Sequence, residues 1–295
     1  MIKVSIMGAG VMGLCVTRKL ISAGYSVAVF DVSAEARTRA ASQGAAACDT
    51  IAEAVKDTPL VLMFLPGPKE IAACVTGERG ILQSIPPGAV IVDHSTVDPA
   101  TSQKMARAAR EKGVGYLDAP VLGRPSIVGN WTLVVGGEPA DLEKCRPVLQ
   151  VLSENISYQG PSGSGNKVKL LNQLMFGAIN AITAEVMAIA EKMGIAPGDF
   201  YKTIAATRAG TVSNLFKELG ARVAEERYDL PTFSVALLNK DMRLAIEMAK
   251  EHSAPPVVSR AVEFLNEVAL AQGLANYDTA VMWKCFQKLW GTVDL

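Results

Sequence analysis

The residues with the clearest chemical meaning lie within the first thirty-one positions of the chain. A glycine-rich turn, Gly8-Ala-Gly-Val-Met-Gly13, follows an apolar run at Val4–Met7 and precedes a segment of helical spacing at Leu14–Ala23. A second apolar run, Ser26–Phe30, ends in Asp31, 18 residues after the last glycine. A glycine turn between a strand and a helix, with an acid at that distance, is typical of dinucleotide-binding sites.

Each glycine of this turn has its own physical task. Gly8 allows the tight turn, Gly10 lets a pyrophosphate approach the backbone, and Gly13 lets the helix pack close to the strand. The N-terminus of the following helix offers free N–H groups and a positive dipole end to the phosphates. The alternative is a glycine turn in an α/β protein that binds no nucleotide.

The acid after the second strand predicts which dinucleotide binds. Asp31 can accept hydrogen bonds from both ribose hydroxyls of NAD and would repel a 2′-phosphate. Arg37 and Arg39 lie a few residues further on, so NADP remains possible. The sequence therefore favours NAD over NADP.

A second group of polar residues follows a helical spacing in the middle of the chain. At about 100° per residue, Asn172, Gln173 and Asn180 fall within roughly 60° of Lys169 on a helical wheel. The rest of this helix is apolar, and a buried lysine is costly unless it is paired or used. A desolvated lysine can titrate nearer neutrality, which suits general acid–base chemistry at a carbonyl or hydroxyl. The alternative is a solvated polar stripe, because Lys167 lies beside it.

The first half of the chain predicts alternating strands and helices. Such alternation favours an α/β fold, a Rossmann-type doubly wound parallel sheet, over residues 1–162. The later expected strands are Leu60–Leu65, Ala89–Val92, Tyr116–Ala119 and Thr132–Val135, and the expected helices are Glu35–Gln43, Lys69–Val75 and Thr101–Lys112.

The second half, residues 163–295, predicts an all-helical domain that a long helix at Asn166–Met193 joins to the first. The later helices are expected at Pro197–Ala206, Val212–Glu226, Phe233–Glu251, Pro256–Gln272 and Asp278–Trp290, with Pro231, Pro255-Pro256 and Gly273 between them. The long helix is apolar on more than one side, which favours a homodimer or homotetramer. A central helix in a monomeric core is the alternative.

Composition narrows the class of protein further. The 295 residues carry 29 acidic and 29 basic side chains, with no basic stripe or tail, so no nucleic-acid partner is expected. Five scattered cysteines without a Cys-x-x-Cys favour free thiols, and the two histidines give no metal signature. No unbroken apolar run of membrane length is expected, and the chain starts with a strand rather than a secretory signal. These features favour a cytoplasmic protein.

Motifs along the whole chain resemble the β-hydroxyacid dehydrogenases, the family of 3-hydroxyisobutyrate dehydrogenase, tartronate semialdehyde reductase and sulfolactaldehyde reductase. The matching segments are, in order, Gly8–Gly13, Asp93-His-Ser-Thr96, Asp118-Ala-Pro-Val121, Gly136-Gly137, Gly163-Ser-Gly165 leading to Lys169-Leu-Leu-Asn172, and Asn239-Lys240-Asp241. Together these motifs indicate the family but not one substrate.

The resemblance implies roles for individual residues. Lys169 would be the catalytic acid–base, which donates a proton to the carbonyl in reduction and removes one from the hydroxyl in oxidation. Lys240, from the helical domain, would reach back to the cofactor. The other implied cofactor contacts are Val11, Met12, Asp31, Leu65, Pro66 and Thr96. His94 is expected to be a loop residue rather than a base, because Lys169 already fills that role.

Two departures from the family pattern concern the substrate. Where the family has Ser-Gly-Gly, this chain has Leu122-Gly123-Arg124, followed by Pro125. Leu122 offers no side-chain hydrogen bond, whereas the Arg124 guanidinium is shaped to bind an oxyanion. The family also has two asparagines three and four residues after the lysine, and in this chain these positions hold Asn172 and Gln173. These residues are the candidate substrate contacts.

The sequence thus predicts an NAD-dependent dehydrogenase or reductase of a small acidic β-hydroxy compound. A sulfonate substrate is the nearest alternative, since sulfolactaldehyde reductase also carries an arginine in this loop. An imine reductase is a second, although those relatives generally lack the lysine. A cofactor-binding protein without turnover is the third.

Overall fold

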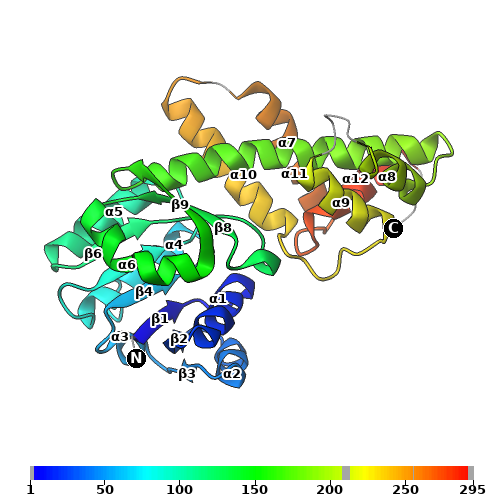
Figure 1. Cartoon of the computed structure of the whole chain (residues 1–295). Coiled ribbons are helices and arrows are strands. Elements are labelled where there is room, and N and C mark those ends of the chain that lie inside the picture. The colour runs from blue at the N-terminus through cyan, green and yellow to red at the C-terminus, as the bar shows by residue number, and fades with distance from the viewer. Residues whose placement is uncertain (1–2, 208–212, 255, 292–295) are drawn as a thin grey trace. The chain divides into compact units, whose positions relative to one another are not determined.

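The computed structural model describes residues 3–207, 213–254 and 256–291. Its contacts group into two units, which we call the N-terminal unit (Met1–Lys169) and the helical unit (Leu170–Leu295). Each unit is described separately below (Figure 1).

The N-terminal unit is built on one nine-stranded sheet with the strand order β3-β2-β1-β4-β5-β6-β8-β7, and β9 pairs with β8. Strands β1 to β6 pair in parallel, so their carboxyl ends share one edge. The strand order reverses at β1, with β2 and β3 on one side and β4, β5 and β6 on the other, which confirms the predicted Rossmann-type sheet. The strands are β1 Lys3–Met7, β2 Ser26–Phe30, β3 Ala46–Ala47, β4 Leu60–Met63, β5 Val90–Asp93, β6 Gly115–Asp118, β7 Val121–Leu122, β8 Trp131–Gly136 and β9 Ser153–Gly160.

Both faces of this sheet are covered, which explains the continuous apolar runs of its central strands. Leu60 and Leu62 point into one apolar core, while Val61 and Met63 point into the other. A strand buried on both faces must be apolar at every position. The helices are α1 Val11–Ser22, α2 Ala34–Ser42, α3 Ile51–Val55, α4 Pro68–Thr76, α5 Pro99–Glu111 and α6 Pro139–Leu152, with short 3-10 turns at Ile81–Gln83 and Pro125–Ile127.

The sheet departs from a wholly parallel arrangement at one end. Strand β8 pairs antiparallel with β6 and β7. Only a short loop separates β7 from β8, and a parallel pair would need a crossover of a dozen residues or more, so the chain must reverse. The sequence pattern also gave no sign of β9, because this strand is polar and largely exposed.

The helical unit contains no strand among its described residues, as the sequence predicts. Helix α7, Ser164–Lys192, begins in the N-terminal unit and continues through the helical unit. The others are α8 Pro197–Ala205, α9 Asn214–Ala224, α10 Val235–Glu251, α11 Val257–Ala271 and α12 Met282–Leu289, with a 3-10 turn, η3, at Thr279–Val281. Val212, where one helix was expected to begin, and Pro255 lie outside the described residues.

Helix α7 qualifies the expectation about membrane-length segments. By length and composition it could cross a bilayer, with a mean hydropathy of 1.4 over its most apolar window. Its polar side chains Gln173 and Asn180 are buried and hydrogen-bond to α10 and η3. Helices in the core of a protein can have the same length and apolar composition, so these properties of α7 are only weak evidence for a membrane span.

Candidate active site

The three glycines of the first turn differ in what surrounds them. Gly8 has a φ of +97°, and a Cβ there would lie 2.3 Å from the Phe64 carbonyl oxygen. A Cβ at Gly13 would lie only 1.8 Å from the carbonyl oxygen of Gly8. Around Gly10, in contrast, a Cβ would meet nothing within 4 Å. Packing therefore explains Gly8 and Gly13, whereas Gly10 leaves open space in front of α1.

This open space lies at the N-terminus of α1, where backbone donors are available. Gly10 is the N-cap residue, so no side chain caps the helix, and the first turn carries no acid. The N–H groups at the start of a helix have no partner within the helix and face outward with a partial positive charge. The turn thus fits the pyrophosphate of a dinucleotide.

Asp31, at the end of β2, is fixed against the same turn. Its two carboxylate oxygens accept hydrogen bonds from the backbone N–H groups of Ala9 (2.7 Å) and Ser33 (2.8 Å). Both nearby arginines meet acids: Arg37 lies 3.2 Å from Asp49 and Arg39 lies 2.6 Å from Glu35. This edge therefore presents a carboxylate where a 2′-phosphate would need a cation.

The turns after β4 and β5 are tied together. The Leu65 N–H donates to Ser95 Oγ (2.9 Å), and the Ser95 N–H donates to Asp93 Oδ1 (2.9 Å). Pro66 is exposed and Thr96 is half-buried within these turns. The predicted contacts Leu65, Pro66 and Thr96 thus lie at the strand edge where open α/β sheets bind ligands. Ser95 and Asp93, which hold them, were not singled out from the sequence.

His94 lies within this edge and is fully enclosed. Its ring stacks on Phe64 with centroids 4.8 Å apart, and its Nδ1 lies 2.7 Å from the Ala119 carbonyl oxygen. A carbonyl can only accept, so Nδ1 carries the proton of a neutral ring. Burial lowers the pKa of His94 to about 4. This neutral, buried imidazole agrees with the expected loop role rather than that of a base.

Asp118, at the end of β6, anchors the start of α7. Its carboxylate accepts hydrogen bonds from the backbone N–H groups of Gly163 (2.6 Å) and Asn166 (2.9 Å). Burial raises the pKa of Asp118 to about 6, although these donors oppose the shift. The sequence indicates Asp118 only as part of a family motif and assigns it no role; an acid that ends an apolar strand is the signal that could have pointed to the anchor.

Lys169 follows this anchor on α7, and its ammonium lies at the same end of the sheet. Nζ donates to the Val121 carbonyl oxygen at 2.8 Å, just beyond β6, and the side chain is half-buried. Because Asp118 fixes the first turn of α7 and Val121 holds Nζ, the ammonium is well positioned. It can act as a proton donor at the edge that carries the predicted nucleotide contacts.

The loop Leu122–Arg124, where the sequence differs from the family pattern, packs on a tryptophan. Leu122 pairs with Thr132 across the β7–β8 ladder, and the Trp131 indole N–H donates to the Arg124 carbonyl oxygen (2.8 Å). A Cβ at Gly123 would lie 2.4 Å from the Trp131 ring. The backbone of this loop is therefore fixed, and Gly123 is required by the buried ring beside it.

The remaining predicted residues lie in the helical unit. Asn172 and Gln173 hydrogen-bond to each other, and Gln173 also bonds to Asp241, the neighbour of Lys240. Asn180 bonds instead to the Thr279 carbonyl oxygen at 3.2 Å. The polar face of α7 is therefore largely buried, and its residues bond to two different elements, α10 and η3.

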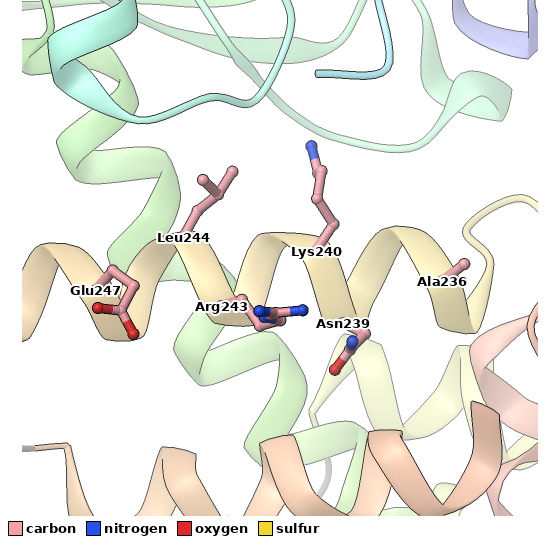
Figure 2. A pocket seen from close by; sticks show the side chains of 6 residues that line it. All are labelled: Ala236, Asn239, Lys240, Arg243, Leu244 and Glu247. Atoms are coloured by element: carbon pink, nitrogen blue, oxygen red, sulfur yellow. The ribbon is translucent and has the colours of Figure 1, made fainter. Parts of the chain in front are cut away.

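A pocket lies along α10 (Figure 2). Lys240 and Leu244 project from one side of this helix, and Asn239 and Arg243 project from the other. Two of its lining side chains, those of Lys240 and Arg243, are basic. Among the described residues of the whole chain, no group of three His, Cys, Asp or Glu side chains gathers to bind a metal.

Two family models match successive parts of this chain. Residues 3–160 match the family described as the NAD-binding domain of 6-phosphogluconate dehydrogenase, and residues 163–286 match the family described as NAD-binding of NADP-dependent 3-hydroxyisobutyrate dehydrogenase. The fold and the matches define an NAD(P)-dependent oxidoreductase that acts on hydroxyl groups.

Individual relatives narrow the class. The chain is 31% identical to 2-(hydroxymethyl)glutarate dehydrogenase of Eubacterium barkeri, over 98% of this chain and 96% of the relative. It is 30% identical to the NAD-dependent L-serine dehydrogenase of Pseudomonas aeruginosa, over 98% and 99%. A crystal structure of 3-hydroxyisobutyrate dehydrogenase from Salmonella typhimurium superposes with a TM-score of 0.89 at 25% identity, covering 96% of this chain and 99% of the other. The chain belongs to the β-hydroxyacid dehydrogenase family.

Proposed function

We propose that this protein interconverts a small β-hydroxy acid and its semialdehyde or keto form with NAD(H), and that Lys169 is the general acid–base. The observation that carries the proposal is the position of the Lys169 ammonium. It is held by the Val121 carbonyl oxygen at the strand edge that also carries the glycine turn and Asp31. A proton donor at the edge where a nicotinamide cofactor binds is what carbonyl reduction requires.

The residues of this chain divide the work between binding and proton transfer. The open space at Gly10 and the first turn of α1 bind the pyrophosphate, and Asp31 binds the ribose hydroxyls. The bound nicotinamide supplies or accepts the hydride. In reduction the Lys169 ammonium donates a proton to the carbonyl oxygen, and in oxidation the neutral amine takes the hydroxyl proton. The Val121 carbonyl keeps Nζ in place during both.

We further propose that the substrate is a 3-hydroxy acid whose anionic group is bound by Leu122–Arg124, with Asn172 beside the reacting group. The named substrates of the relatives above share a hydroxymethyl group next to a carboxylate-bearing carbon. The backbone of the loop is preformed on Trp131, and Arg124 adds a guanidinium suited to a carboxylate or sulfonate.

NAD is the proposed cofactor in preference to NADP. Asp31 presents a carboxylate at the end of β2, and the two nearby arginines already face acids. A 2′-phosphate at this edge would meet a negative charge without an available cation, which disfavours NADP.

We also propose that the protein is a cytoplasmic homodimer or homotetramer. Large apolar side chains recur along one face of α7 and are exposed in the single chain: Leu171, Met175, Ile182 and Ile189. An apolar stripe of this length favours self-association. Light scattering should show an oligomer that Met175→Glu with Ile182→Glu dissociates; a wild-type monomer would contradict this proposal.

A substrate panel tests the proposed activity. Purified protein is assayed for NADH and NADPH formation with 3-hydroxyisobutyrate, L-serine, 2-(hydroxymethyl)glutarate and a hydroxypropanesulfonate. We expect at least one carboxylate to turn over, with a higher kcat/KM for NAD than for NADP. Preference for the sulfonate would assign Arg124 to that group, whereas reduction of cyclic imines alone, or NADH binding without any turnover, would overturn the proposal.

A further inference from the structure

Four polar side chains form a continuous link between α7 and α10. Asn172 Nδ2 donates to Gln173 Oε1 (3.3 Å), and Gln173 Nε2 donates to Asp241 Oδ2 (2.6 Å). The other oxygen of Asp241 lies 2.8 Å from Lys240 Nζ. The link therefore runs from the polar face of α7 to the ammonium of Lys240.

The carboxylate at the centre of this link is withdrawn from water. Asp241 and Gln173 are each only 3% exposed. A buried carboxylate is costly unless charges and hydrogen-bond donors compensate it. Lys240 supplies the charge, and Gln173 supplies a donor to the second oxygen. Gln173 thereby fixes the plane of the carboxylate that Lys240 faces.

Both the length and the orientation of the Gln173 side chain are needed for its contact with Asp241. Asn172 holds its amide oxygen, so its amide nitrogen is directed at Asp241. An asparagine here would be one methylene shorter, a retreat of about 1.5 Å, and its donor would fall short of Asp241. The glutamine that replaces the family's asparagine is therefore matched to this contact.

We propose that Gln173 is a positioning residue that orients Lys240 through Asp241, and so preorganises the cofactor contact that the resemblance implies for Lys240. This inference rests on the proposed function. The competing explanation is a purely structural clamp between helices. The same unit contains such a link elsewhere, where Gln287 of α12 donates to Glu191 of α7.

A double-mutant cycle separates the two explanations. NADH binding to the full-length protein is measured by fluorescence titration for Gln173→Asn, Lys240→Met and the double variant, with thermal unfolding of each. Gln287→Asn is the matched control. It shortens a buried glutamine of α12 that donates to Glu191, a carboxylate on α7, the helix that carries Gln173. Gln173→Asn loses the charge-assisted hydrogen bond to Asp241, so Lys240 is no longer held in place for the cofactor. We expect the NADH Kd of this variant to rise roughly tenfold.

The cycle has distinct outcomes. The proposal expects the effect of Gln173→Asn on Kd to vanish in the Lys240→Met background, and Gln287→Asn to lower the Tm without changing Kd. An unchanged Kd in Gln173→Asn, or equal weakening in both backgrounds, would overturn it and leave a structural clamp. Failure of the wild-type protein to bind NADH would instead overturn the proposed function.

Discussion

The N-terminal unit and the helical unit carry their candidate chemistry in different ways. In the N-terminal unit the key groups lie at strand ends and are fixed by bonds to backbone groups, as when the Ala9 N–H donates to the Asp31 carboxylate. In the helical unit they are side chains on two helices, joined by contacts such as Gln173 to Asp241. A sheet fixes its strand ends by the register of the strands, whereas a helix pair fixes its polar groups only through the side chains themselves. Substitutions should therefore affect the two units differently.

The largest expected effect concerns Lys169. Removing a positioned general acid typically costs a hundredfold to ten-thousandfold, so Lys169→Ala should lower kcat by about that factor. NADH affinity should stay nearly intact, because the glycine turn and Asp31 are untouched. Steady-state kinetics and fluorescence titration measure the two quantities. Lys167→Ala, an exposed lysine on the same helix, is the control; wild-type turnover in Lys169→Ala would contradict the assignment.

A pair of glycine substitutions sharpens the comparison within the N-terminal unit. In Gly13→Ala the new Cβ meets the backbone of Gly8 at 1.8 Å, so the free energy of unfolding should fall by about 3 kcal/mol or more. Gly10→Ala has open space, so its stability should be unchanged while NADH binding weakens at least about tenfold. Denaturant unfolding and NADH titration distinguish them. Equal stability of both variants would show that the glycines are not divided between packing and binding.

Acid stability tests the buried histidine of the same unit. The pKa of His94 is about 4 when folded and about 6.5 when unfolded, so the unfolded chain takes up a proton first as the pH falls. The free energy of unfolding is therefore unaffected by His94 above pH 6.5. It falls as the pH drops from 6.5 towards 4, by up to about 3 kcal/mol. His94→Gln removes this titration, and the unfolding free energy of that variant should fall less over the window. An unchanged slope in His94→Gln would mean that His94 titrates normally.

The smallest effect concerns cofactor choice. Asp31→Ala removes the carboxylate that would repel a 2′-phosphate, so the ratio of NADPH to NADH affinity should rise by roughly tenfold. Because Asp31 also binds the Ala9 N–H, some weakening towards both cofactors is expected, and only the ratio reports selection. Glu111→Ala, which removes an exposed acid at the end of α5 and leaves both arginine pairs intact, is the control. An unchanged ratio would remove Asp31 from the selection.

The sequence predicted the central strands of the N-terminal unit and helices α1, α2, α4 and α5, because their signals are local, but it did not predict β3, α3 or α6. The glycine turn and Asp31 lie within one strand–helix–strand segment, and the buried strands are continuous apolar runs. Strand β9 was missed because it is polar and exposed, and β7 because it is only two residues long. The antiparallel end of the sheet depends on a loop length that the pattern did not reveal.

The polar links of the site could be predicted only in part. A helical wheel places Gln173 and Asn180 on one face of α7, but it cannot show that one bonds to Asp241 and the other to Thr279. These partners lie 68 and 99 residues away along the chain. Such pairings depend on how helices pack, which no local periodicity records.

The most direct test of the central claim is the rate of hydride transfer in a single turnover. Protein saturated with NADH is mixed with a semialdehyde substrate identified by the panel, and loss of NADH is followed by stopped flow in wild type and Lys169→Ala. We expect hydride transfer to be slowed about a hundredfold or more in Lys169→Ala. Hydride transfer at the wild-type rate in Lys169→Ala would contradict it.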